Sequence, residues 1–241
     1  MDLDTITSRI AEGISSVDKS TKSLRANART GEIYLPGAKT LTEVELVREL
    51  TAWWHACYPN DFRPDSDIVV EYPYPNLSRA NCDLVFTSDT HSSDEPEWAI
   101  EIKHIALVGN NGKNNDYGVG KTLSPYLKDR SLIHDIDRLR KNRIAPRRAV
   151  IMYGFEYSFD SCDQAGMRHP DSASIISEVR RVCRSVDQID GRYTLEPLIR
   201  FANEIFVSNG LTKSTAVTAE FLNAWRHPCG GNGTVAAWEV P

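Results

Sequence analysis

The chain has 241 residues, of which 41% are hydrophobic and 25% are charged. This composition excludes a disordered, collagen-like or low-complexity protein and supplies enough apolar residues for a buried core. The formal net charge of -5 excludes a protein that holds nucleic acid by bulk charge, so any nucleic-acid contact requires a local basic patch.

Residues 1–40 predict a short amphipathic helix followed by a polar connector. The apolar residues at helical spacing are Ile6, Ile10, Ile14 and Val17. A second helix is expected after Thr42, because Thr42 and Glu45 match the capping-box pattern. Glu43 projects onto the apolar side of this helix at its start. There it is either a charge that favours the helix dipole or a site residue.

Three strands, a helix and a further strand are predicted next. The strands are expected at 67–75, 81–86 and 98–108, where β-branched and aromatic runs lie between turn residues. Ser124 and Pro125 form a helix-start signal, and that helix is expected to end at residue 142. A strand follows at 147–155. Residues 41–155 therefore predict an α/β unit.

The rest of the chain, residues 156–241, has weaker periodicity. We predict a helix at 172–186, a strand near 204–207, a helix near 218–225 and a strand at 234–240. No linker-like segment separates this part from the preceding one. We therefore expect it to be a C-terminal α/β elaboration of the same domain.

Asp83, Glu101 and Lys103 form the constellation that points to chemistry. Alternate residues of a strand share a face, so Glu101 and Lys103 are expected to point the same way. In a hairpin about the loop 87–97, Asp83 and Glu101 lie equally far from the loop and therefore face each other. Facing carboxylates repel unless a cation lies between them, and such oxygen ligands suit Mg²⁺ or Mn²⁺.

The lysine can orient water or stabilise negative charge that develops on a phosphate. The alternative is a cross-strand salt-bridge cluster without a metal. Because the surrounding residues are apolar, the pattern favours a functional site over a solvated cluster.

Asp83 followed by the segment Glu101-Ile102-Lys103 resembles the motif of the PD-(D/E)XK nuclease superfamily, which includes many restriction endonucleases. The resemblance covers residues 41–155, where the order of elements also matches that family. It implies a restriction-endonuclease-like αβββαβ core, with a mixed central sheet flanked by helices. The proline that precedes the aspartate in the family is absent here, where Cys82 stands.

The same resemblance implies the roles of the site residues. Asp83 and Glu101 would be metal ligands, the backbone carbonyl of Ile102 a third ligand, and Lys103 the catalytic lysine. Several branches of the family place a glutamate on the helix before the sheet, and Glu43 matches that position. The implied reaction is hydrolysis of a phosphodiester bond by water with Mg²⁺, for which Mn²⁺ can substitute.

We therefore expect a Mg²⁺-dependent endonuclease that cuts DNA, of a restriction or defence type, and that acts as a homodimer with two symmetric sites. The alternatives are a DNA-repair or junction-resolving nuclease, an RNA-cutting nuclease, an inactive nucleic-acid-binding module with a nuclease-like fold, or a structural protein. The basic residues that could contact phosphates are Lys121, Arg138, Arg140, Lys141 and Arg143.

The sequence also predicts where the protein is found. It contains no run long and apolar enough for a transmembrane helix, and its first residues do not resemble a secretory signal. Its five cysteines form no C-x-x-C motif, as is typical of reduced thiols. We expect a soluble, cytoplasmic protein with no membrane partner.

Overall fold

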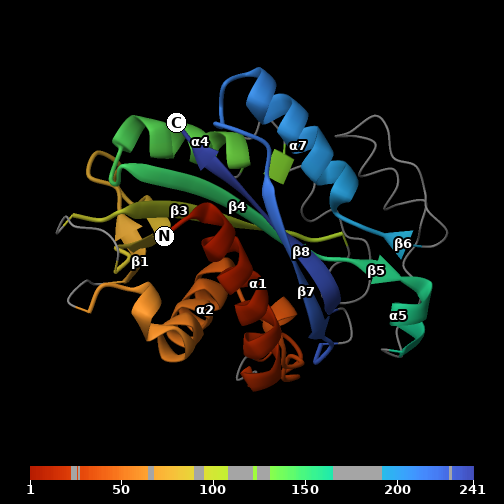
Figure 1. The fold of residues 1–241 in the computed structure, drawn as a ribbon. Helices are drawn as coiled ribbons and strands as arrows, with labels where there is room; N and C mark the ends of the chain where they lie inside the picture. The colour runs from red at the N-terminus through yellow and green to blue at the C-terminus, as the bar shows by residue number, and fades with distance from the viewer. Residues whose placement is uncertain are drawn as a thin grey trace.

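A six-stranded mixed sheet flanked by helices forms the framework of the computed structural model (Figure 1). The structure describes residues 1–22, 26, 28–64, 68–89, 95–107, 122–123, 131–164, 192–227 and 230–241. The strands of the sheet are β1 (Val69–Pro73), β2 (Asn81–Phe86), β3 (Trp98–Ile105), β4 (Arg147–Phe155), β7 (Val217–Ala224) and β8 (Gly231–Val240). The helices are α1 (Leu3–Ser20), α2 (Glu43–Cys57), α4 (Leu132–Asn142), α5 (Phe159–Gln164) and α7 (Glu196–Ser208).

The strands of the sheet lie in the order β1-β2-β3-β4-β8-β7. β3 and β4 are parallel, and every other neighbouring pair is antiparallel. Parallel neighbours need a crossover connection, and α4 lies in the one between β3 and β4. The short strands β5 (Tyr157–Ser158) and β6 (Arg192–Tyr193) form a separate two-stranded ribbon.

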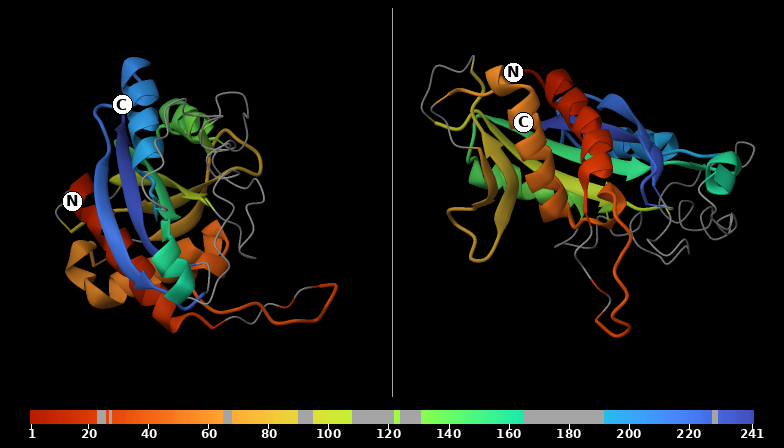
Figure 2. Two further views of the ribbon diagram at one scale, coloured as in Figure 1. Left: turned by 90° about the vertical axis from the view of Figure 1, so that its right-hand side faces the viewer. Right: turned by 90° about the horizontal axis from the view of Figure 1, so that it is seen from below.

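The helices form a layer on each face of the sheet (Figures 1 and 2). α1 packs against α2, β7 and β8, and α2 packs against β1, β2 and β3. α4 packs against β3 and β4 on the opposite face. α7 lies on the same face as α4, where Phe206 meets the ring of Trp238 edge to face at 5.3 Å.

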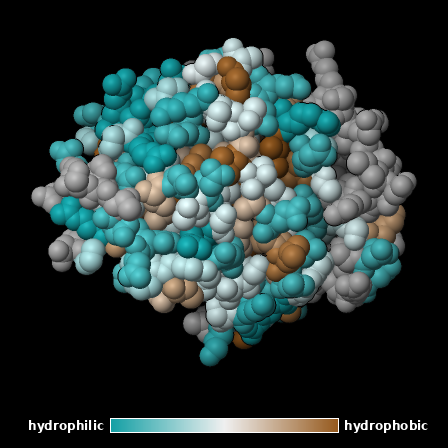
Figure 3. All heavy atoms as spheres, viewed as in Figure 1, coloured by the Kyte–Doolittle hydropathy of each residue, from teal (hydrophilic) through white to brown (hydrophobic). Residues whose placement is uncertain are grey.

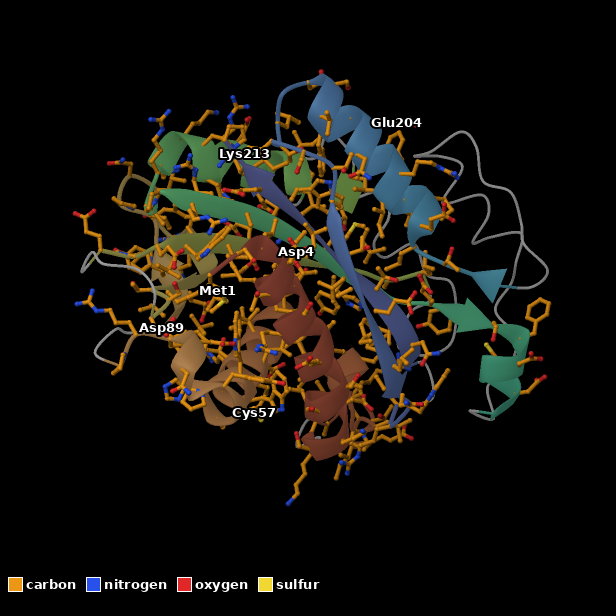
Figure 4. The ribbon with its side chains drawn as sticks, viewed as in Figure 1. Met1, Asp4, Cys57, Asp89, Glu204 and Lys213 are labelled. Atoms are coloured by element: carbon orange, nitrogen blue, oxygen red, sulfur yellow. The ribbon has the colours of Figure 1, made fainter. Side chains whose placement is uncertain are left out.

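The core lies at the centre of the sheet, where β3 and β4 are covered on both faces. From residue 149 to 155 every residue of β4 is buried, which explains the continuous apolar sequence of this part of the strand. Trp98, Trp238 and Phe86 are among the largest fully buried side chains. Side chains fill the space between the helices and the sheet, whereas Glu204 points outward from α7 (Figure 4).

The outer surface is more polar. The face seen in Figure 3 is mostly hydrophilic, with separate hydrophobic spots. Figure 2 shows residues 28–36, which precede α2, projecting from the body of the protein. No helix in the described part of the chain combines the length and apolar character needed to cross a membrane.

The elements predicted before residue 156 are confirmed where the structure describes them. The capping box at the start of α2 is present: the hydroxyl of Thr42 accepts from the N–H of Glu45, and Glu45 accepts from the N–H of Thr42 at 2.8 Å. The predicted helix start at Ser124 and Pro125 lies outside the described residues. α4 begins at Leu132, with Ser131 as its N-cap.

Two predictions in the last third of the chain are wrong, and one is confirmed. The segment 204–207, predicted as a strand, belongs to α7, because its apolar residues continue a helical stripe with Leu198 and Ala202. The segment 218–225, predicted as a helix, forms most of β7, whose first five residues alternate between half-buried or buried and exposed. The final strand is confirmed as β8, and the helix predicted at 172–186 lies outside the described residues.

Candidate active site

The candidate site lies where β2 and β3 stop pairing. The ladder between them runs from Phe86 opposite Trp98 to Leu84 opposite Ile100, and the same register places Asp83 opposite Glu101. At this point the carboxylate of Asp83 accepts the backbone N–H of Ile102 at 2.7 Å. Beyond the last residue pair of the ladder, the side chain of Asp83, and not the backbone of β2, forms the hydrogen bond to the edge of β3.

A second carboxylate, that of Glu43, accepts a hydrogen bond from the same edge of β3 two residues after Ile102. Glu43 is the first residue of α2, and its Oε1 accepts the backbone N–H of His104 at 3.0 Å. Ile102 and His104 present their N–H groups to the same edge because alternate residues of a strand do so. The side chain of His104 lies on the other face of the sheet, half-buried and stacked on Tyr153.

Glu101 is almost fully buried and has several partners. Its Oε1 accepts the hydroxyl of Tyr74 at 2.6 Å and Nη2 of Arg138 at 3.0 Å. The register of the two strands places the carboxyl group of Asp83 opposite it. Burial raises the pKa of both carboxyl groups, and for Glu101 the charges of Asp83 and Asp135 raise it further. Negative charge on both Asp83 and Glu101 is therefore unfavourable unless a cation lies close to them.

Lys103 lies on the same face of β3 as Glu101. Its Nζ is 3.5 Å from Oε2 of Glu43 and 3.5 Å from Oδ2 of Asp135. Burial alone would lower the pKa of Lys103, but the surrounding carboxylates, led by Asp135 and Glu43, outweigh it and raise the pKa above its ordinary value. Lys103 therefore carries a positive charge and cannot serve as a proton acceptor at neutral pH.

The charges of this cluster do not balance. Its carboxylates are Glu43, Asp83, Glu101 and Asp135, and its cations are Lys103 and Arg138. The excess of two negative charges matches one divalent cation. Within the described residues, no three His, Cys, Asp or Glu side chains form a set that could hold a metal ion. Mg²⁺ does not require such a set, because it keeps several waters and usually takes one or two carboxylates.

The oxygen donors present therefore fit Mg²⁺. Asp83 and Glu101 are adjacent, and the N–H of Ile102 points to Asp83. The carbonyl of Ile102 faces the same edge, because the N–H and C=O of one strand residue do so. These are the three donors expected from the sequence.

The basic residues predicted to contact phosphates separate into two groups. Arg138 faces the site, where it pairs with Glu101 and Asp135. The other described residues of this group are exposed at the end of α4, and they are Arg140, Lys141 and Arg143. Lys121 lies outside the described residues.

Sequence reasoning did not identify Tyr74 and Asp135 as members of the cluster. Asp135 had a signal that could have revealed it, since it lies on the apolar stripe of α4 between Leu132 and Leu139 and is fully buried. A carboxylate on an apolar helix face needs a partner inside the protein. Tyr74 follows the end of β1 and has no periodic pattern that would place it beside Glu101.

In comparisons with known proteins, no family model, no curated protein and no solved structure matches this chain.

Proposed function

We propose that the chain is a Mg²⁺-dependent endonuclease that hydrolyses phosphodiester bonds of DNA, with a core of the PD-(D/E)XK type. The observation that carries this proposal is the facing pair of carboxylates, half-buried Asp83 and fully buried Glu101, beside the charged Lys103. Burying two carboxylates side by side is costly unless a cation joins them. A divalent cation between them would offset this cost.

Each residue of the cluster has a role in this proposal. Asp83, Glu101 and the carbonyl of Ile102 would hold Mg²⁺, which when bound polarises the phosphate and lowers the pKa of a water. Lys103 keeps its charge and is held between Glu43 and Asp135, so it would stabilise negative charge on the phosphate rather than accept a proton. Glu43 positions Lys103 and closes the edge of β3.

The finer parts of the proposal are the substrate and the assembly. We infer a restriction or defence role on DNA, with a homodimer that cuts both strands, because two symmetric sites are the simplest way to break a duplex. A DNA-repair or junction-resolving nuclease and an RNA-cutting nuclease would use the same residues. Assays with plasmid, branched DNA and RNA separate these substrates.

A second candidate is a nucleic-acid-binding module without catalytic activity. The observation that favours it is the bond of Arg138 to Glu101, which supplies a positive charge where a metal would bind. In that case the cluster is a set of internal ion pairs. Mg²⁺ would then leave the thermal stability unchanged, and nucleic acid would be bound but not cut.

Nicking and linearisation of a supercoiled plasmid with Mg²⁺, with Mn²⁺ and with chelator tests the proposal. The variants Asp83→Asn and Lys103→Gln should lose cleavage while they keep the folded state measured by circular dichroism. Lys213→Gln is the matched control, because Lys213 is exposed and pairs at 2.7 Å with Glu239 outside the cluster. Cleavage by all four proteins alike, or metal-independent cleavage, contradicts the proposal.

A further inference from the structure

Arg138 has an unusual set of partners for an arginine in a candidate metal site. Its Nη2 bonds Oε1 of Glu101 at 3.0 Å and also Oδ1 of Asp135, so one nitrogen holds both carboxylates. Its side chain is only 19% exposed, and its guanidinium lies 5.6 Å from the ring centre of Tyr74. Arg138 is therefore bound both to Glu101, which is a proposed metal ligand, and to Asp135, which is not.

The arrangement also leaves hydrogen-bonding groups unused. Among the described residues, four buried side-chain atoms have no hydrogen-bond partner, and two of them are Nε of Arg138 and Oδ2 of Asp135. A third, Nε2 of His104, lies on the other face of the sheet and is not part of the cluster. Oδ2 of Asp135 still has an ion pair with Nζ of Lys103 at 3.5 Å, whereas Nε of Arg138 is a donor without a partner beside the site. Unsatisfied buried groups are rare because each costs free energy, so this donor needs an explanation. The explanation is a second arrangement of the Arg138 guanidinium, in which its other nitrogens act as donors.

We propose that Arg138 is an exchangeable counter-ion, which neutralises Glu101 in the metal-free protein and turns to the phosphate of the substrate when Mg²⁺ takes its place. This inference rests on the proposed function, and it concerns how the same site is switched on. Asp135 remains bound to the arginine throughout and acts as its anchor.

Charge and geometry both support the exchange. A divalent cation at Glu101 repels a guanidinium 3.0 Å from the same carboxylate, so the two cations compete for it. Asp135 lies on α4 three residues before Arg138 and is fully buried, so it can retain the side chain after Glu101 releases it. The guanidinium fork then has free donors with the spacing that suits two phosphate oxygens.

Isothermal titration of Mg²⁺ into the protein, without nucleic acid, tests the competition directly. Arg138→Gln removes the competing charge, and we expect it to bind Mg²⁺ about tenfold more tightly than the wild type, because a nearby positive charge is lost from a buried site. Arg138→Lys keeps the charge and should bind Mg²⁺ as the wild type does. Arg200→Gln is the matched control, since Arg200 is exposed on α7 and pairs with Glu196 at 3.7 Å.

A role for Arg138 that is only structural gives the opposite result. If the arginine merely orients Glu101, Arg138→Gln binds Mg²⁺ more weakly than the wild type or equally well, and the proposal is overturned. Circular dichroism at the titration temperature establishes that each variant is folded. If Arg138→Gln does not fold, Arg138→Met serves as the neutral variant with a similar apolar stem.

Plasmid cleavage at saturating Mg²⁺ tests the second half of the exchange. We expect Arg138→Gln to cut at least about tenfold more slowly in kcat although it binds the metal more tightly, because the phosphate loses a charged partner. Normal cleavage by this variant overturns the inference and leaves the proposed nuclease intact. Absence of Mg²⁺ binding and of cleavage in the wild type overturns the proposed function itself, and the inference with it.

Discussion

Glu43 accepts the backbone N–H of His104 at 3.0 Å with one carboxylate oxygen and lies 3.5 Å from Nζ of Lys103 with the other. The first residue of α2 thus closes the edge of β3 and holds the lysine of the candidate site at the same time. Each carboxylate oxygen of Glu43 has a different partner. Substitutions of Glu43 can therefore separate its contribution to stability from its contribution to the candidate site.

Glu43→Gln and Glu43→Ala should differ in stability but not in activity. Glutamine keeps a carbonyl oxygen that can accept from His104, so the free energy of unfolding should change by less than about 1 kcal/mol. Alanine leaves that N–H without a partner and should cost about 1–3 kcal/mol. Both variants lose the charge beside Lys103, and both should cut plasmid at least about tenfold more slowly.

Urea unfolding and plasmid cleavage of the two variants provide the measurements. Equal destabilisation by glutamine and alanine would show that the hydrogen bond to β3 does not account for the effect of Glu43 on stability. Full activity of Glu43→Gln would remove Glu43 from the site.

Mg²⁺ should stabilise the wild-type protein, and Asp83→Asn should abolish this stabilisation. A ligand at 100 times its Kd adds about 2.7 kcal/mol to the free energy of unfolding when it binds the folded state alone. In the absence of metal, Asp83→Asn should be at least as stable as the wild type. Its amide can donate to Glu101, and the repulsion that raises the pKa of Glu101 is reduced.

Thermal unfolding with Mg²⁺ and with NaCl of equal ionic strength measures this difference. The salt control separates specific binding from screening of the excess negative charge. A Tm that rises equally with both salts, or that rises equally in the wild type and Asp83→Asn, would argue against a metal site at this position.

The register of the hairpin could be predicted from the sequence, and with it the facing positions of Asp83 and Glu101. That prediction used only the alternation of a strand and the position of a loop, which are local properties of the chain. The contacts of Arg138 and Tyr74 with Glu101 could not be obtained in this way. They depend on how α4 lies across the sheet and where the chain turns after β1, which tertiary packing decides.

The errors of the C-terminal part have a similar physical origin. Residues 204–207 form a short apolar run that fits a strand or a helix equally well, and the helical stripe of α7 is visible only over the longer window that includes Leu198. β7 contains residues that also occur in helices, and its pairing with β8 fixes its conformation. Short segments of this kind adopt the structure that their neighbours require.

The contact of α7 with the sheet provides a test of the fold that is independent of the site. Trp238 is fully buried, meets Phe206 edge to face and donates from its indole to Asn203 at 2.7 Å. Trp238→Ala should cost about 3–5 kcal/mol of unfolding free energy, because it removes a large side chain from a packed core. Trp238→Phe should cost less, since it keeps the ring contact. Chemical denaturation of both variants measures the difference, and equal losses would mean that the ring contact contributes nothing.

Stability should fall as the pH is lowered from about 6.5 to about 4, in part because of His227. Burial, together with the smaller effect of the charge of Lys39, lowers the pKa of His227 to about 4. In this range the unfolded chain binds a proton that the folded protein excludes, so the folded state loses free energy relative to the unfolded state. Below pH 4 both states are protonated and the loss is complete. This lowering of the pKa corresponds to a loss on the order of 3 kcal/mol.

His227→Gln isolates this contribution, because the other perturbed groups remain in both proteins. Asp18 binds the backbone of Arg226 next to His227, and burial raises its pKa, so its contribution has the opposite sign and favours the folded state at low pH. Desolvation lowers the pKa of His104 as well, which adds to the loss in both proteins. Urea unfolding at pH 7, 5.5 and 4 should therefore show a smaller decrease for His227→Gln than for the wild type. Equal losses of unfolding free energy in the two proteins would contradict this prediction. They would mean that His227 binds a proton in the folded protein as readily as in the unfolded chain.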